Sequence, residues 1–598
     1  MEKHSRLPLA LALPLPAQAA KGKRTWRPLL LLPLLLLTAP LLTRHLPALP
    51  LNLPAVLTTT PPAPYTGDTC AQLAPLFPTT HAAHWQRAKA TYAAPGYLAE
   101  AAEHLGGIVR IDTVVYDNWG PPAEDDRWAK FAQVQVWLEH NFPLVYAHLQ
   151  FTTVNKYGLV YHWPGSDSTL KPLMLTAHQD VVPIDPVTAS QWLHPPFSGY
   201  YDGEWIWGRG AGDQKSGLVG ILLAVETLLA QGFAPRRGVI LAFGFDEEAS
   251  GKWGAESISR YLMSTFGLDS VGLLIDEGGG LAVQGEQLFA MPCVGEKGYV
   301  DVRVEVTTPG GHSSVPEPHT GIGYLSALIT LLESHPNPTL LTRTNPYYEN
   351  LVCAATFGSL PAAYADDIIR SRTDDAALKR VEAVVAGTKQ GRAMIGTTQA
   401  ADLVGGGSVK VNALPEKVWA VVNHRISVDS SVQEVKDRFV ALLQPYALAN
   451  ALSLTAFGLN VTHPAPGPGP GQALNGHITL SQAWTPSTQL EPAPVSPHTR
   501  GAPAWDLLAG TIRAVWDDTE GGAVVSPSVT GGNTDTRYYW KLTKAIYRYG
   551  GMKATDSYNG AHTGADVRTV NEAIRASGFV DRIKFYTAII LNADESDL

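Results

Sequence analysis

The chain has 598 residues, of which 45% are hydrophobic and 17% are charged. This length predicts two or three domains, and this composition is typical of a globular protein with a large core. The net charge of -9, and the lack of a basic stripe with interleaved aromatic residues after residue 60, argue against a nucleic-acid partner.

The N-terminal segment has the pattern of a targeting signal. Residues 1–27 form a basic tail in which Glu2 is the one acid, and residues 28–57 are a leucine-rich region broken by Pro33 and Pro40. We expect an uncleaved signal anchor with its basic end in the cytosol. A cleaved signal peptide is the main alternative, and a disordered Leu/Pro-rich tail is less favoured. Either targeting signal would send the rest of the chain into the secretory lumen.

Three further features bear on the compartment. Residues 58–94 begin with a Pro-rich run, which predicts a stalk. Asn460 starts an Asn-Val-Thr glycosylation sequon, which fits a lumenal location. Cys70, Cys293 and Cys353 are far apart and odd in number, so they form neither a metal-binding pattern nor a disulfide framework. One bridge between two of them is an alternative, but we expect all three to be packing residues.

Alternation of strand and helix patterns predicts an α/β domain. Between residues 150 and 281, apolar strand-like runs alternate with apolar helix-like segments, which is typical of a mainly parallel sheet with helices on both faces. At residue 298 the pattern changes to half-buried strands and amphipathic helices, which predicts a small α+β domain inserted into the larger one. This inserted domain is called the lid below. The expected lid elements are strands at 299–307, 409–411, 417–426 and 452–457 and helices at 321–334 and 432–448.

These patterns divide the chain into segments. The catalytic domain is expected in two parts, 95–297 and 501–598, on either side of the lid. The lid is expected at 298–460, and a Pro/Gly-rich linker or loop at 461–500.

Polar residues end several of the predicted strands of the first domain. The run 173–180 ends in His178 and Asp180, which share one face because strand side chains alternate. Asp213 ends a Gly-rich turn, Glu247 and Glu248 follow the next strand, and Asp276 follows another. Since sites in open α/β sheets form at the carboxyl ends of strands, we expect these side chains to meet there.

The residue types at these positions suit zinc. Imidazole nitrogen and carboxylate oxygen are its ligands where thiolates are absent, whereas magnesium usually prefers a water-rich, all-oxygen shell. Two zinc ions need one bridging carboxylate and further ligands on either side. One carboxylate, Glu247, is then left over as a general base for hydrolysis by metal-activated water. The candidate ligands are His178, Asp213, Glu248, Asp276 and a second histidine.

Four motifs together resemble the M20 metallopeptidases, and within them the fungal vacuolar carboxypeptidase S group, over about residues 95–598. They are Thr176-Ala-His-Gln-Asp180, Gly208-Arg-Gly-Ala-Gly-Asp213, Asp246-Glu-Glu248 and Ile275-Asp-Glu-Gly278. The resemblance implies a zinc-binding α/β domain with an inserted lid. It also implies that His178 binds one of two Zn²⁺ ions, Asp213 bridges both, and Glu248, Asp276 and a late histidine complete the shells. Asp180 would orient His178, and Glu247 would be the general base.

The same resemblance gives roles to three weaker candidates. His312 would stabilise the oxyanion, Arg425 would hold the substrate carboxylate, and Asn533 lies in a Gly-rich substrate loop. From the residues alone, the first is a turn histidine, the second a solvated or ion-paired arginine, and the third part of a tight turn.

The late histidine admits two alignments. In the favoured one, His562 is the ligand and residues 564–569 are an insertion behind it. In the other, Arg568 takes the histidine's place, and because arginine stays protonated and cannot coordinate zinc, the site would lack a ligand.

We therefore expect a zinc-dependent exopeptidase that removes C-terminal residues from short peptides. An N-acyl-amino-acid hydrolase or synthase using the same site is one alternative, and an inactive lumenal binding protein is another. The resemblance implies the vacuole lumen or membrane, with secretion as the alternative, and the lid is a candidate surface for a homodimer.

Overall fold

The computed structural model describes residues 69–598, except 359, 463–473, 485–488, 520 and 559–569. The predicted basic tail and anchor therefore lie outside the described residues. Within the described part of the chain, no helix is both long enough and apolar enough to cross a membrane.

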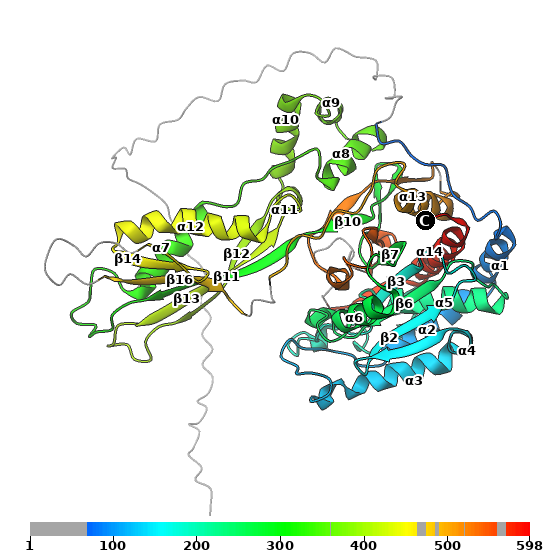
Figure 1. The fold of residues 1–598 in the computed structure, drawn as a ribbon, viewed down its shortest axis with the longest axis horizontal. Coiled ribbons are helices and arrows are strands. Elements are labelled where there is room, and N and C mark those ends of the chain that lie inside the picture. The colour runs from blue at the N-terminus through cyan, green and yellow to red at the C-terminus, as the bar shows by residue number, and fades with distance from the viewer. Residues whose placement is uncertain (1–68, 359, 463–473, 485–488, 520, 559–569) are drawn as a thin grey trace, which may run out of the picture. The chain divides into compact units, whose positions relative to one another are not determined.

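An eight-stranded mixed sheet forms the centre of the catalytic domain (Figure 1). The adjacent strands β6, β3, β7 and β19 are parallel, and β1 and β2 add an antiparallel edge. β3 and β6 are buried along their whole length, because helices cover both faces, which is why they are continuous apolar runs in the sequence. In spatial order the strands are β1 (Gln150–Val154), β2 (Gly158–Trp163), β6 (Val239–Gly244), β3 (Leu173–His178), β7 (Leu273–Asp276), β19 (Ile546–Arg548), β10 (Cys293–Glu296) and β18 (Ser528–Thr530).

Helices pack on both faces of this sheet, which confirms the predicted fold class. On one face, α5 (Lys215–Ala230) and the C-terminal helix α14 (Ala576–Glu595) share one large apolar cluster, into which Leu175 of β3 points. On the other face, α6 (Ala255–Phe266) packs in a second cluster that contains Met174 of the same strand. The outer helices are α1 (Ala82–Tyr92), α2 (Tyr97–Val109), α3 (Phe131–Asn141), α4 (Pro143–His148) and α13 (Pro503–Val515).

The lid is a six-stranded sheet that α7 (Gly321–Ser334) and α12 (Val432–Ala449) pack against. Burial alternates along β11 because only one of its faces meets these helices. In spatial order the strands are β12 (Thr398–Gly406), β13 (Lys417–Ile426), β11 (Gly298–Thr307), β16 (Gly476–Gln482), β14 (Leu452–Ala456) and β15 (Leu459–Thr462).

Two lid expectations differ from the structure. β16 lies inside the predicted linker, yet it pairs with both β11 and β14, so the lid sheet extends past residue 460. The strand expected at 409–411 is an exposed turn, and β12 is the edge strand of the sheet. The Pro/Gly-rich run before β16 hid this strand in the sequence.

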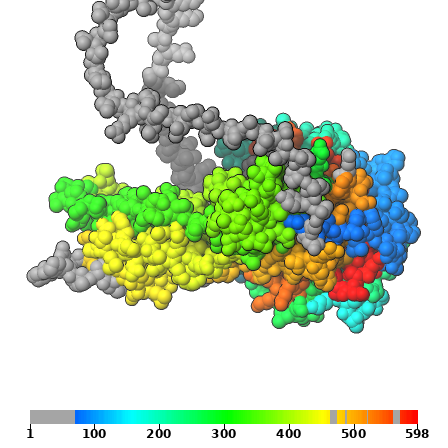
Figure 2. All heavy atoms as spheres, turned by 90° about the horizontal axis from the view of Figure 1, so that it is seen from above, coloured from blue at the N-terminus to red at the C-terminus, as the bar shows by residue number. Residues whose placement is uncertain are grey.

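A helical insertion interrupts the lid between α7 and β12, and the sequence patterns did not predict it. Its helices share an apolar cluster of their own. It also contacts the catalytic domain, where the Asn350 amide donates to the Ser526 hydroxyl at 2.8 Å. Figure 2 shows the yellow-green surface of the insertion against the orange surface of the returning catalytic segment. The insertion consists of α8 (Pro346–Phe357), α9 (Ala362–Arg370), α10 (Asp375–Ala386) and α11 (Lys389–Ile395).

The stalk expectation is wrong for residues 69–94, which pack on the catalytic domain. Trp85 of α1 is buried in its core, and the Leu76 amide donates to the Gly510 carbonyl at 2.8 Å. At the start of this segment, Cys70 forms a disulfide with Cys353 of α8. The expectation of three packing cysteines is thus wrong for this pair, whereas Cys293 is a buried free thiol.

The disulfide gives a stability prediction. Replacing Cys70 and Cys353 together by Ser should lower the free energy of unfolding by about 2–4 kcal/mol, because the bond closes a long loop in the unfolded chain. Thermal unfolding with and without reductant measures the effect. Reductant should lower the midpoint of the wild type and of Cys293→Ala, but not of the double variant. Equal midpoints for the wild type and the double variant would contradict the prediction.

Candidate metal centre and active site

His178, the last residue of β3, lies at the centre of the site and is almost fully buried. Its Nδ1 donates to the Asp180 carbonyl at 3.0 Å and lies 3.3 Å from the Asp180 carboxylate. Its Nε2 lies 3.1 Å from Oδ1 of Asp213. A carboxylate-bound Nδ1 leaves Nε2 as the nitrogen for a metal, so the predicted orienting role of Asp180 fits the geometry.

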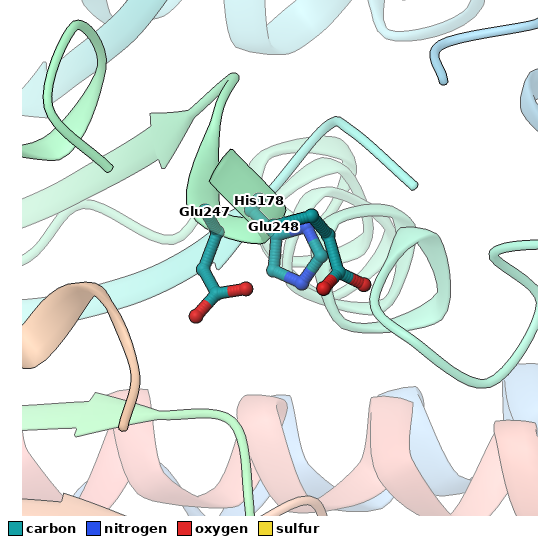
Figure 3. A group of neighbouring side chains, drawn as sticks. All are labelled: His178, Glu247 and Glu248. Carbon is teal, nitrogen blue, oxygen red and sulfur yellow. The ribbon is translucent and has the colours of Figure 1, made fainter. Parts of the chain in front are cut away.

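Asp180 also fixes the segment that carries the predicted base. After β6 the chain turns into a short 3-10 helix, Glu247–Ala249. The Asp180 carboxylate accepts the backbone amides of Glu247 and Glu248 at 3.1 and 2.9 Å. Figure 3 shows the carboxylates of Glu247 and Glu248 on either side of the His178 imidazole. Potential ligand atoms of these three residues lie within 4.8 Å of one another.

A second group of potential ligands shares His178 and consists of His178, Asp213 and Glu277. Nε2 of His178 lies 3.6 Å from the Glu277 carboxylate. The neighbouring Asp276, predicted as a ligand, instead accepts the Thr176 hydroxyl at 2.7 Å and is not in either group. The structure therefore brings Glu277, which sequence reasoning missed, into a group of potential ligands. Asp276 stays an alternative ligand, because its Oδ2 is buried without a hydrogen-bond partner among the described residues.

The electrostatics of the site are those of a cation-binding pocket. Burial, and then the neighbouring carboxylates of Asp213 and Asp276, raise the pKa of Glu277 to about 7. Burial and the Glu277 charge also raise the pKa of Glu247 well above its usual range. A divalent cation would relieve this repulsion, and the imidazole and carboxylate donors fit zinc.

The predicted ligand His562 lies outside the described residues, as does Arg568, so the choice between the two alignments remains a prediction. The residues on either side of 559–569, a segment called the excursion below, are described. Ser557 forms an isolated β-bridge with Ile574, and Tyr558 packs its ring on Trp207 at 4.6 Å between centroids. Because strand β20 (Ala573–Arg575) pairs with β5 (Trp205–Trp207), the excursion begins and ends beside the Gly-rich turn of Asp213.

The structure brings Arg425 and Asn533 together across the junction of lid and catalytic domain. Nη1 of Arg425 donates to the Asn533 side-chain carbonyl at 3.4 Å, and its guanidinium lies over the Tyr299 ring. Arg537, on the same Gly-rich loop, was missed. Burial lowers its pKa, but Tyr538, Tyr299 and the Glu247 carboxylate raise it overall, so its charge lies close to the predicted base. Its Nε has no hydrogen-bond partner among the described residues.

The structure does not bring His312 to this site. The residue is exposed in the loop beyond the far end of β11, where it bridges to Ala413 and contacts Ser314. β11 has ten residues, so at about 3.3 Å per residue its far end at Thr307 lies about 30 Å from the start of the lid at Gly298, and His312 comes after that end.

Comparison with known proteins agrees with this geometry. A model of "Peptidase family M20/M25/M40" matches residues 174–592. The chain belongs to this family. Carboxypeptidase S of Saccharomyces cerevisiae is 39% identical over 511 residues, which cover 84% of this chain and 85% of the relative. The N-fatty-acyl-amino acid synthase/hydrolase PM20D1 of Mus musculus is 30% identical over 499 residues, which cover 82% of this chain and 87% of the relative.

Solved structures show the same fold. Human carnosine dipeptidase 1 superposes with a TM-score of 0.55 at 14% identity. The match covers 87% of this chain and 100% of the carnosine dipeptidase chain. The M20 family metallo-carboxypeptidase Sso-CP2 of Sulfolobus solfataricus gives 0.54 at 16% identity, covering 83% and 100%. The expected M20 metallo-carboxypeptidase, its resemblance to carboxypeptidase S and its fold class are thus confirmed.

The adjacent acids Asp276 and Glu277 give a matched pair of variants. Glu277→Gln should weaken metal binding by more than the roughly 10–100-fold that loss of an outer-sphere partner costs, because it removes a potential ligand. Asp276→Asn should keep its affinity, since its Oδ1 can still accept the Thr176 hydroxyl. Metal content after dialysis against a graded chelator measures both. Loss of metal in Asp276→Asn alone would restore the original assignment.

Proposed function

We propose that this protein is a zinc-dependent carboxypeptidase that removes C-terminal residues from short peptides. The observation that carries the proposal is the position of Glu247 within one of two groups of potential ligands that share His178. The similarity to carboxypeptidase S supports it. The ligands we propose for two zinc ions are His178, Asp213, Glu248, Glu277 and His562.

The chain's own residues account for the proton transfers. Zinc, when bound, would supply Lewis acidity toward the scissile carbonyl and the attacking water. Glu247 is held by its backbone amide on Asp180, with its carboxylate directed at the centre of the site. It takes the proton from the water and gives it to the leaving amine. A raised pKa suits this task, because the group must both accept and release a proton near neutral pH.

Cationic side chains at the lid junction suit a free carboxylate on the substrate. Arg425 donates to Asn533, Arg537 follows Asn533 on the same loop, and a guanidinium binds a carboxylate through two parallel hydrogen bonds. Arg537 is close to Glu247, so a carboxylate held there would place the last amide bond near the base. This arrangement supports cleavage at the C-terminus rather than inside a peptide.

An N-acyl-amino-acid hydrolase or synthase is the second candidate. Its substrates, like those of a carboxypeptidase, have an amide bond next to a free carboxylate, so the same arginines and the same base would act on them. The mouse relative PM20D1 is named for that activity. Rates on an N-blocked dipeptide and on an N-fatty-acyl amino acid, compared directly, separate the two. No turnover of either would favour the inactive binding protein.

We also propose a lumenal location, in the vacuole or outside the cell. The Cys70–Cys353 disulfide suits an oxidising compartment, and Asn460 is exposed on β15, where a glycan could be attached. The predicted signal anchor at residues 28–57 would tether the chain to the membrane.

A homodimer through the lid would explain the position of His312. Among the described residues β12 pairs only with β13, and it carries the exposed side chains of Leu403 and Val404. Such an edge can pair with a second chain. His312 of one chain could then reach the site of the other, whereas in its own chain it lies beyond the far end of β11.

Replacing the base tests the reaction. Glu247→Gln should fold and keep its zinc but lose about 10²–10⁴-fold in kcat, the usual contribution of a general base. Metal analysis and dipeptide hydrolysis, before and after chelation, measure this. Near-normal turnover in this variant would remove Glu247 from the role, and activity that survives full metal removal would refute the zinc mechanism.

Mixing two inactive variants tests the dimer. His312→Ala and Glu247→Gln, refolded together, should regain about a quarter of the wild-type rate, because half of the dimers are mixed and each mixed dimer has one complete site. Each variant alone provides the control. If His312 acts within its own chain, the mixture should be no more active than its components.

A further inference from the structure

Glu572 is a buried acid that neither the proposed ligand set nor the proposed mechanism uses. It follows the excursion 559–569 and directly precedes β20. Its Oε1 accepts the backbone amides of Gly210, Gly212 and Asp213 at 3.0, 2.7 and 3.2 Å. Its Oε2 accepts Nη1 of Arg209 at 2.6 Å.

These contacts make Glu572 the internal anion of the Gly-rich turn. Backbone amides that converge on one point form an anion-binding nest, and here the anion is a side chain from a distant part of the sequence. The backbone of Glu572 also contacts the turn, because its carbonyl accepts the Gly208 amide at 2.9 Å. Removal of the carboxylate would leave buried amides and the buried Arg209 charge without these acceptors, which is costly.

The glycines of the turn allow this approach. Gly210 has φ +89°, a left-handed conformation that other residues adopt at a cost. A Cβ on Gly212 would lie 3.3 Å from Oε1 of Glu572, closer than most side-chain contacts. The turn therefore needs glycine where the carboxylate enters.

The turn ends at Asp213, whose backbone amide is one of the three donors and whose Oδ1 lies 3.1 Å from His178 Nε2. Holding the amide fixes the backbone from which this carboxylate projects. We propose that Glu572 is a positioning residue of the metal centre, which clamps the Gly-rich turn and so sets the direction of the Asp213 carboxylate. Glu572 would not itself bind metal, because both of its oxygens already accept hydrogen bonds from the turn. This inference rests on the proposed metal site.

Cobalt binding to the metal-free full chain, followed by visible absorption, tests the clamp without any peptide substrate. Glu572→Ala should weaken cobalt binding by about 10–100-fold, as loss of an outer-sphere partner does, and should shift the absorption band. Glu572→Gln should be intermediate, since its amide oxygen can still accept the turn amides while its NH₂ faces Arg209. The matched control is Glu204→Gln. Glu204 is an exposed acid that pairs with Arg575 of β20, the strand that follows Glu572, and this variant should behave as wild type.

Unchanged cobalt affinity and spectrum in Glu572→Ala would overturn the clamp. If that variant does not fold by circular dichroism, Glu572→Gln decides by the same two readouts, and wild-type behaviour there overturns the clamp as well. A wild-type chain that binds no cobalt would instead overturn the proposed metal site, and the clamp's role with it. The two failures are therefore distinguishable.

Discussion

The hydrogen bonds of the Asp180 carboxylate hold the site together. This fully buried group accepts two amides of the turn after β6, while the same residue accepts Nδ1 of His178 at the end of β3. Two parallel strands are thus joined at their carboxyl ends by one side chain. The direction of the imidazole and the position of Glu247 both follow from this junction, because each depends on what Asp180 accepts.

Around this junction the fold concentrates negative charge in a buried place. Carboxylates of Asp213, Glu247 and Glu277 surround one imidazole, and the burial that raises the pKa values of Glu247 and Glu277 also excludes water. Repulsion between these buried carboxylates destabilises the folded protein. Buried like charges of this kind are typical of functional sites. The continuous apolar packing of β3 and β6 on both faces supplies the rigid support that this arrangement requires.

The central sheet was predictable because a strand buried on both faces must be apolar throughout, and the polar residues at its end then stand out. His178 and Glu247 were found in this way. Glu277 was not found as a potential ligand, because adjacent acids at a strand end differ only in side-chain direction, which the pattern of residues does not give. The role of Glu572 was not predictable, since its partners lie about 360 residues earlier in the chain.

The pairing of Cys70 with Cys353 could not be predicted from the sequence either, because a spacing of 283 residues carries no information about contact. If the proposed anchor tethers the chain to a membrane, this bond also determines which backbone cuts could release it. A single cut of the backbone anywhere between residues 71 and 352 yields two fragments that the disulfide still joins, so an N-terminal anchor would remain attached. Only a cut before Cys70 separates the whole of residues 70–598 from such an anchor. The short stretch that precedes this cysteine is therefore the one place where a protease acting once could convert an anchored form into a released one.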